Sequence, residues 1–179
     1  MPQTAHKASH TCGAAAWVDL RVEPITQSEF APYGTLLLPA EDGKLFGSDD
    51  AQLTLSNGLP RFYIMTLPAR DMGFRHITRH LAVTQCLASV GGHPWVIAVA
   101  PPDEPDNPQA KPDTSKLRAF RIQGDQAIML SRSTWHIGPF FEENKASFFN
   151  LELSDTNQTD HHSCYLDRDF GLQFQLIQP

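Results

Sequence analysis

Short runs of β-branched, aromatic and aliphatic residues recur along this chain, and turn-forming residues such as Asn57-Gly58 and Gly91-Gly92 separate them. The expected strands cover residues 35–38, 61–67, 74–81, 85–89, 95–100, 117–122, 126–130, 147–153 and 172–177. No long segment repeats its apolar residues every 3.6 positions. The pattern therefore predicts an all-β sandwich or closed barrel with few helices.

A helical turn and a long loop complete the expected architecture. Thr26 is a candidate N-cap, and Glu29 follows it by three residues, as in a capping box. The stretch PPDEPDNPQAKPD, residues 101–113, carries five of the fourteen prolines, so we expect a surface loop between two strands rather than a domain linker.

Length and composition favour one ordinary globular domain. The chain has 179 residues, a net charge of -6 and three cysteines without a CxxC pair. We expect a polar, mobile segment over residues 1–16 and a single domain over 17–179. The charge argues against nucleic acid and anionic membranes as partners, and the longest apolar stretch is too short to span a bilayer. A cytoplasmic protein is the expectation.

Two histidines share one face of the expected strand over residues 74–81. Strict alternation places Phe74, His76, Thr78 and His80 on that face and Arg79 on the other, where we expect it to be an exterior charge. His76 and His80 are separated by roughly 13 Å along a strand, so they cannot bind one metal ion together. Only one of them can belong to a compact site.

Two segments of the chain keep the spacing of a known pair of histidine motifs. Thr78, His80, Gln85 and Gly92 keep the frame H-x-H-x(3,4)-E-x(6)-G of the first motif, and His136 stands where the second motif has its histidine. Together the two segments resemble the paired motifs of the cupin superfamily. The resemblance implies a double-stranded β-helix, or jelly-roll, barrel. It also implies a metal site of His80, Gln85 and His136, in which threonine and glutamine replace a histidine and a glutamate.

A metal bound there would have two imidazoles and a neutral amide oxygen as protein ligands. Such a set suits nickel, zinc or iron, with water or substrate completing the shell. The alternative is that both histidines only hydrogen-bond a ligand or each other.

Further short motifs occur in a fixed order across about residues 20–161. They include Glu23-Pro24, FAPYG at residues 30–34, Ser56-Asn57-Gly58, Arg61, Arg79-His80, Thr84-Gln85, LRAF at 117–120 and Thr134-Trp135-His136. In this order they resemble the ureidoglycolate lyase family. The resemblance implies a homodimeric carbon–nitrogen lyase of the amidine-lyase type. It would split ureidoglycolate into glyoxylate and urea in purine and allantoin catabolism.

The remaining site residues come from the chemistry of such a substrate. His80, His136 and Glu152 are candidate catalytic residues, Glu152 as a general base if it faces the cavity rather than solvent. The substrate-binding candidates are Arg61, Asn57, Asn150 and Gln85. Arg61 would pair with the carboxylate, although a solvated strand-end arginine explains it equally well. His161 and His162 are expected in a loop.

Two other functions remain open at this stage. One is a cupin that binds a small carboxylate without catalysis, which the reduced ligand set favours. The other is a cupin isomerase or epimerase that uses a histidine base and no metal.

Overall fold

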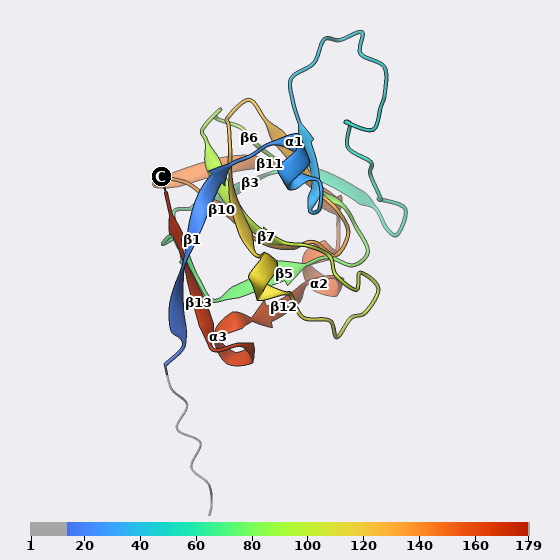
Figure 1. The fold of residues 1–179 in the computed structure, drawn as a ribbon. Helices are drawn as coiled ribbons and strands as arrows, with labels where there is room; N and C mark the ends of the chain where they lie inside the picture. The colour runs from blue at the N-terminus through green and yellow to red at the C-terminus, as the bar shows by residue number, and fades with distance from the viewer. Residues whose placement is uncertain (1–13, 179) are drawn as a thin grey trace, which may run out of the picture.

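A computed structural model describes residues 14–178 of the chain, and strands wind through it as two curled sheets (Figure 1). Of the expected mobile segment 1–16, the first 13 residues lie outside the described residues. Among residues 14–178, no helix is both long and apolar enough to cross a membrane.

Within residues 14–178, thirteen strands form the two sheets. The eight-stranded sheet has the order β12-β5-β10-β7-β8-β1-β13-β4, and the five-stranded sheet has the order β2-β9-β6-β11-β3. The strands are β1 (Ala16–Pro24), β2 (Gly34–Leu37), β3 (Pro60–Pro68), β4 (Gly73–Phe74), β5 (His76–Arg79), β6 (Gln85–Ser89), β7 (Trp95–Ala100), β8 (Arg118–Ile122), β9 (Ala127–Leu130), β10 (Trp135–Phe140), β11 (Lys145–Leu153), β12 (His162–Tyr165) and β13 (Leu172–Ile177). Consecutive strands often belong to different sheets, so the chain winds between them. The predicted all-β jelly-roll barrel is confirmed.

The helices are short, as predicted. They are α1 (Gln27–Phe30), α2 (Thr156–Thr159), α3 (Leu166–Asp169) and a 3₁₀ turn over Thr114–Lys116. The Thr26 hydroxyl accepts a hydrogen bond from the backbone N–H of Glu29 at 3.2 Å, which confirms the predicted N-cap of α1.

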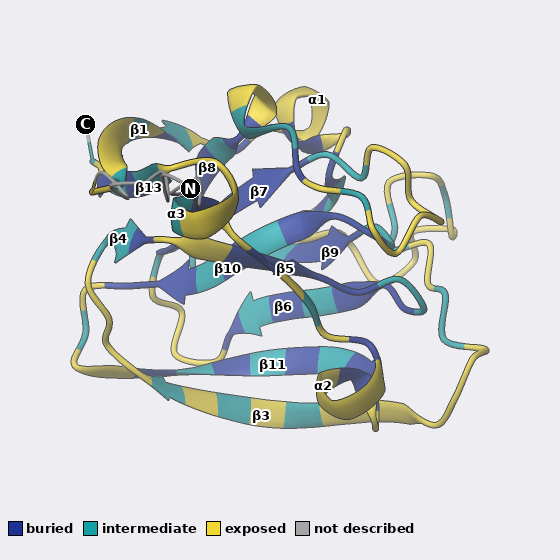
Figure 2. Ribbon diagram, turned by 90° about the horizontal axis from the view of Figure 1, so that it is seen from below, coloured by how far each residue is buried: buried dark blue, intermediate teal, exposed yellow. Residues whose placement is uncertain are grey.

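The core lies on both faces of the central strands. Every residue of β7 is buried, because the side chains on its two faces pack into two separate apolar clusters. In Figure 2, β7 is dark along its length, whereas β3 at the sheet edge alternates between exposed and intermediate residues. This difference places β7 in the centre of the core and β3 at its edge.

The predicted strand over residues 74–81 is interrupted at Arg75, which separates β4 from β5. Phe74 and Ile77 pack in the same core cluster, although strict alternation placed them on opposite faces. The prediction that Phe74 shares a face with His76 is therefore wrong, because the break shifts the alternation. Beyond the break, His76, Thr78 and His80 all line one cavity.

Two further expectations need correction. Arg79 lies opposite His80 but is fully buried instead of exterior, because its guanidinium donates to the backbone carbonyl of Asn107 in the 101–113 loop at 2.5 Å. His162 begins strand β12 instead of lying in a loop, since β12 pairs with β5.

Candidate functional site

A cavity of about 270 Å³ opens between the two sheets. Its walls come from β3, β5, β6, β10 and α2 and from the segments that follow β3, β5 and α2. The lining residues are Met65, Leu67, Arg70, His76, Thr78, His80, Gln85, Leu87, His136, Ile137, Gly138, Pro139, Asn157 and His161. This size is at the small end for a ligand pocket and suits a small metabolite.

His80 is buried, and a hydrogen bond at its Nδ1 atom fixes the orientation of the ring. Its Nδ1 lies 2.6 Å from the backbone carbonyl of Asp160. A carbonyl only accepts, so Nδ1 carries the proton and Nε2 keeps its lone pair. Burial lowers the pKa of His80, against an opposing contribution from that carbonyl. His80 is therefore a neutral imidazole with a free acceptor atom.

His136 has the same arrangement on the neighbouring strand. Its Nδ1 lies 3.0 Å from the backbone carbonyl of Thr134, and its ring centroid is 5.1 Å from that of His80. Burial, and then the proximity of His80, lower the pKa of His136 to about 3. Metal-binding histidines usually donate their second nitrogen to a carbonyl in this way.

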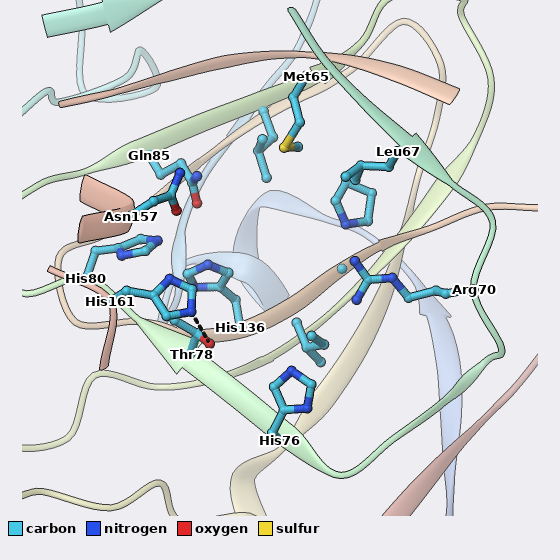
Figure 3. A pocket seen from close by; sticks show the side chains of 14 residues that line it. Met65, Leu67, Arg70, His76, Thr78, His80, Gln85, His136, Asn157 and His161 are labelled. Carbon is cyan, nitrogen blue, oxygen red and sulfur yellow. Dashed lines mark hydrogen bonds between the residues drawn. The ribbon is translucent and has the colours of Figure 1, made fainter. Parts of the chain in front are cut away.

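The His161 side chain is a third imidazole at the cavity. The sequence analysis expected only that His161 lies in a loop. Its ring lies 5.8 Å from that of His80, and its Nε2 is 3.5 Å from the Thr78 hydroxyl (Figure 3). The Asp160 carboxylate holds this segment in place by accepting the backbone N–H groups of Leu81 and Ala82 at 2.7 and 2.8 Å. His161 itself is exposed to solvent. No local sequence signal shows this contact, because it joins residues eighty positions apart.

Gln85 belongs to a buried polar network. Its amide Nε2 donates to Glu152 Oε2 at 3.0 Å and to Asn150 Oδ1 at 3.2 Å. The Tyr63 hydroxyl donates to Glu152 Oε1 at 3.2 Å, and Asn157 lies within 3.4 Å of the same oxygen. A glutamate at position 85 could not donate these bonds and would place a second carboxylate beside Glu152. The contacts with Glu152 and Asn150 thus explain why position 85 carries a glutamine and not a glutamate.

The network also places the two residues whose orientation the sequence left open. Asn150 and Glu152 both face inward, and each is 1% exposed. Glu152 lies behind Gln85 and does not line the cavity. It orients Gln85, whose Oε1 has no hydrogen-bond partner among residues 14–178. An unpaired buried acceptor of this kind calls for a ligand, water or ion.

The donor set partly fits a divalent metal ion. Two neutral imidazoles with free Nε2 atoms and the unpaired amide oxygen of Gln85 are acceptable ligands. Within residues 14–178, however, no three or more histidine, cysteine, aspartate or glutamate side chains are arranged to hold a metal. A bound ion would therefore rely on the glutamine and on water or substrate.

The cation at this cavity is Arg70, which the sequence interpretation did not select. In Figure 3 its guanidinium points into the cavity from the side opposite the three imidazoles. Burial lowers the pKa of Arg70, and no acidic side chain of residues 14–178 forms an ion pair with it. Arg61 lies instead over the Tyr63 ring at 3.7 Å, and Asn57 donates to the Ala82 carbonyl at 3.1 Å. Neither Arg61 nor Asn57 lines the cavity.

His76 lines the same cavity at a distance from the other imidazoles. Figure 3 shows it at the end away from His80 and Gln85, and its ring neighbour is Tyr165 at 6.1 Å. His80, Gln85 and His136 share the opposite part of the cavity.

Sequence comparisons with known proteins agree on one family. A family model described as ureidoglycolate lyase matches residues 18–173. A ureidoglycolate lyase of Stutzerimonas stutzeri is 26% identical over 88% of this chain and 97% of that protein. One of Pseudomonas putida is 27% identical over 80% of this chain and 90% of that protein. A dTDP sugar isomerase of Desulfovibrio desulfuricans superposes with a TM-score of 0.44 at 17% identity, over 78% of this chain and 88% of that one.

Proposed function

Because the chain belongs to the ureidoglycolate lyase family, we propose that it splits ureidoglycolate into glyoxylate and urea. The observation that carries this proposal is the cavity itself, in which neutral imidazoles face an arginine that has no acidic partner among residues 14–178. The reaction would be that of an amidine-lyase-type enzyme in purine and allantoin catabolism.

The substrate carries a carboxylate, a hydroxyl group and a ureido group on one carbon. Cleavage removes the hydroxyl proton, and the O–H electron pair forms the carbonyl of glyoxylate. The C–N bond breaks with its electron pair on nitrogen, which takes up one proton as urea leaves. One proton is removed and one is supplied, so no oxidant or net acid is needed.

Arg70 is the proposed partner of the substrate carboxylate. A guanidinium binds a carboxylate through two parallel N–H bonds. The earlier assignment of this role to Arg61 would require its side chain to leave the Tyr63 ring.

His80 and His136 are proposed to act at the hydroxyl group. Their free Nε2 atoms can accept the hydroxyl proton or hold a nickel, zinc or iron ion together with Oε1 of Gln85. A bound ion would supply Lewis-acid chemistry that lowers the pKa of the hydroxyl.

The other polar groups of the cavity are proposed to bind the ureido end. In the absence of a bound ion, the unpaired Oε1 of Gln85 can accept a hydrogen bond from a ureido N–H group, and the Asn157 amide lines the same cavity. His161 is exposed, and its ring centroid lies 5.8 Å from that of His80. It is the proposed donor of the proton to the departing nitrogen.

A homodimer is proposed on the outer face of the five-stranded sheet. Two cross-strand rows there carry no charge: Phe62, Leu151 and Cys86, and Ile64, Phe149 and Ala88. Phe62 and Ile64 are 67% and 56% exposed. A second copy of the same uncharged face, related by a two-fold axis, would cover these side chains without leaving a charge unpaired.

Product identification tests the proposed function. The purified protein is incubated with racemic ureidoglycolate, and glyoxylate, urea and ammonia are measured together. Glyoxylate and urea in equal amounts without ammonia support a lyase. Ammonia in place of urea would indicate hydrolysis of the ureido group instead. The metal content of the same sample tests whether the protein binds nickel, zinc or iron.

A further inference from the structure

The wall of the cavity that faces the imidazoles is apolar. Strands β5 and β10 of the eight-stranded sheet carry the imidazole wall, whereas β3 and β6 belong to the five-stranded sheet and form the wall opposite. Leu87, Met65 and Leu67 line that second wall and are called the apolar strip below. Figure 3 shows Met65 and Leu67 across the cavity from the imidazoles.

The sheet register sets the order of the side chains along this wall. Leu87 follows Gln85 by two residues on β6, so both point to the cavity. Met65 lies one cross-strand row beyond Leu87, because both strands pair with β11. Leu67 follows Met65 by two residues, on the side where Figure 3 places Arg70. The apolar strip therefore runs between the polar end of the cavity at Gln85 and the cation at Arg70.

The apolar strip is supported by the core behind it and presents no hydrogen-bond donor. Leu87 belongs to one of the two core clusters, and Met65 and Leu67 pack against the same cluster. Leucine has no polar atom, and the methionine thioether is only a weak acceptor. Such a surface favours contact with an apolar group over contact with water. The unbranched Met65 side chain can also adapt to the shape of that group.

The proposed binding mode assigns three of the four substituents on the central carbon of the substrate. The carboxylate pairs with Arg70, and the ureido group lies near Gln85. The hydroxyl group meets His80 and His136 on the imidazole wall. A tetrahedral carbon directs its fourth bond away from the other three, so this bond points to the opposite wall, at Met65. In ureidoglycolate the fourth substituent is a hydrogen atom, which covers little of the apolar strip.

We propose that the site also accepts 2-hydroxy-2-ureido acids in which a short alkyl group replaces this hydrogen and lies against the apolar strip. This inference rests on the proposed function and extends its substrate class. The bond changes are the same. The hydroxyl proton is removed, its electron pair forms the carbonyl, and the C–N bond breaks as the nitrogen takes up one proton. The products are urea and a 2-oxo acid with an alkyl side chain.

Binding of stable analogues tests the fourth position. N-carbamoylglycine and N-carbamoylalanine have no hydroxyl group, so neither can undergo this cleavage. In one enantiomer of N-carbamoylalanine the methyl group takes the fourth position, and in the other it takes the place of the hydroxyl group. Calorimetry with the full-length protein measures each Kd. We expect one enantiomer to bind about fourfold more tightly than N-carbamoylglycine, as for one buried methyl group, and the other enantiomer to show no gain.

Two methionine variants connect this gain to the apolar strip. Met65→Gln keeps the length of the side chain but places an amide in the strip. The ratio of the Kd of N-carbamoylglycine to that of the favoured enantiomer should fall from about four to about one. Met72→Gln is the matched control, because Met72 is also half-buried but does not line this cavity, and it should keep the ratio. A general loss of structure would weaken both analogues and leave the ratio unchanged.

Equal affinity for N-carbamoylglycine and both enantiomers of N-carbamoylalanine would overturn the inference. An unchanged ratio in Met65→Gln would overturn it as well. Absence of binding by all three compounds up to about 10 mM would refute the binding mode, and the inference with it, even if glyoxylate is released. Failure of the proposed function alone gives a different result, in which ureidoglycolate yields no glyoxylate but one enantiomer still binds more tightly.

Discussion

The ring centroids of His80 and His136 lie 5.1 Å apart, and each ring donates its Nδ1–H to a backbone carbonyl. The two carbonyls belong to Asp160 and Thr134, which lie in different parts of the chain. Because both imidazoles have the same tautomer, their Nε2 atoms are available at the cavity together. The predictions below depend on this arrangement and on the groups around it.

Arg70 should control substrate binding. Arg70→Met removes the cation and is expected to raise KM about 10- to 100-fold, because a charge-assisted pair is lost. Steady-state kinetics measures this, with Arg61→Met as the matched control. A larger rise in KM for Arg61→Met would show that Arg61, and not Arg70, binds the substrate carboxylate.

Gln85 and Glu152 should behave as a coupled pair. Gln85→Glu places two carboxylates about 3 Å apart, replacing a hydrogen bond of 3.0 Å, and should destabilise the fold by about 1–3 kcal/mol. Glu152→Gln in the same chain restores a donor–acceptor pair and should recover most of this loss. Urea unfolding of the two single variants and the double variant measures the coupling. Additive effects would contradict the network.

Acid should destabilise the metal-free protein through His136. Its pKa is about 3 in the folded state, below the ordinary value of 6.5, so the unfolded chain binds more protons between these values. Stability therefore falls as pH drops below about 6.5, by at most about 1.4 kcal/mol per pH unit for this group, and solvent in the cavity reduces the effect.

A non-titrating variant isolates this contribution. Unfolding of the wild-type protein and His136→Gln is compared at several pH values between about 7 and 5. The variant should lose less stability on acidification than the wild type. Equal losses would show that His136 is not buried in its neutral form.

The outer face of the five-stranded sheet should mediate self-association. Ile64→Glu places a charge in the apolar face at a 56% exposed position, so it should dissociate a dimer with little effect on the fold. Light scattering should give twice the chain mass of 19.9 kDa for the wild type and the single mass for the variant. A wild-type protein that is monomeric at micromolar concentration would contradict the proposal.

The local sequence pattern was sufficient to predict the bounds of the central strands. The predicted bounds of β6, β7 and β13 match the structure, because these strands are short apolar or alternating runs between turn residues. The face assigned to His80 is also correct. Strand β12 was missed because its sequence, HSCY, has little strand preference and pairs only through its contact with β5.

The missed site residues depend on contacts between distant segments. His161 reaches the cavity because Asp160 binds the backbone at Leu81 and Ala82. Arg79 is buried because the 101–113 loop covers it. Arg70 follows β3 at an exposed position that no periodicity identifies. Spacing along the sequence shows none of these relationships.

Glyoxylate release by the His80→Ala and His136→Ala variants tests the central claim most directly. Both variants and the wild type are assayed with racemic ureidoglycolate, and His76→Ala serves as the matched histidine control. We expect active wild type and His76→Ala, and a loss of kcat of about 100-fold or more in the other two variants. Near-normal release of glyoxylate from both His80→Ala and His136→Ala would contradict the account.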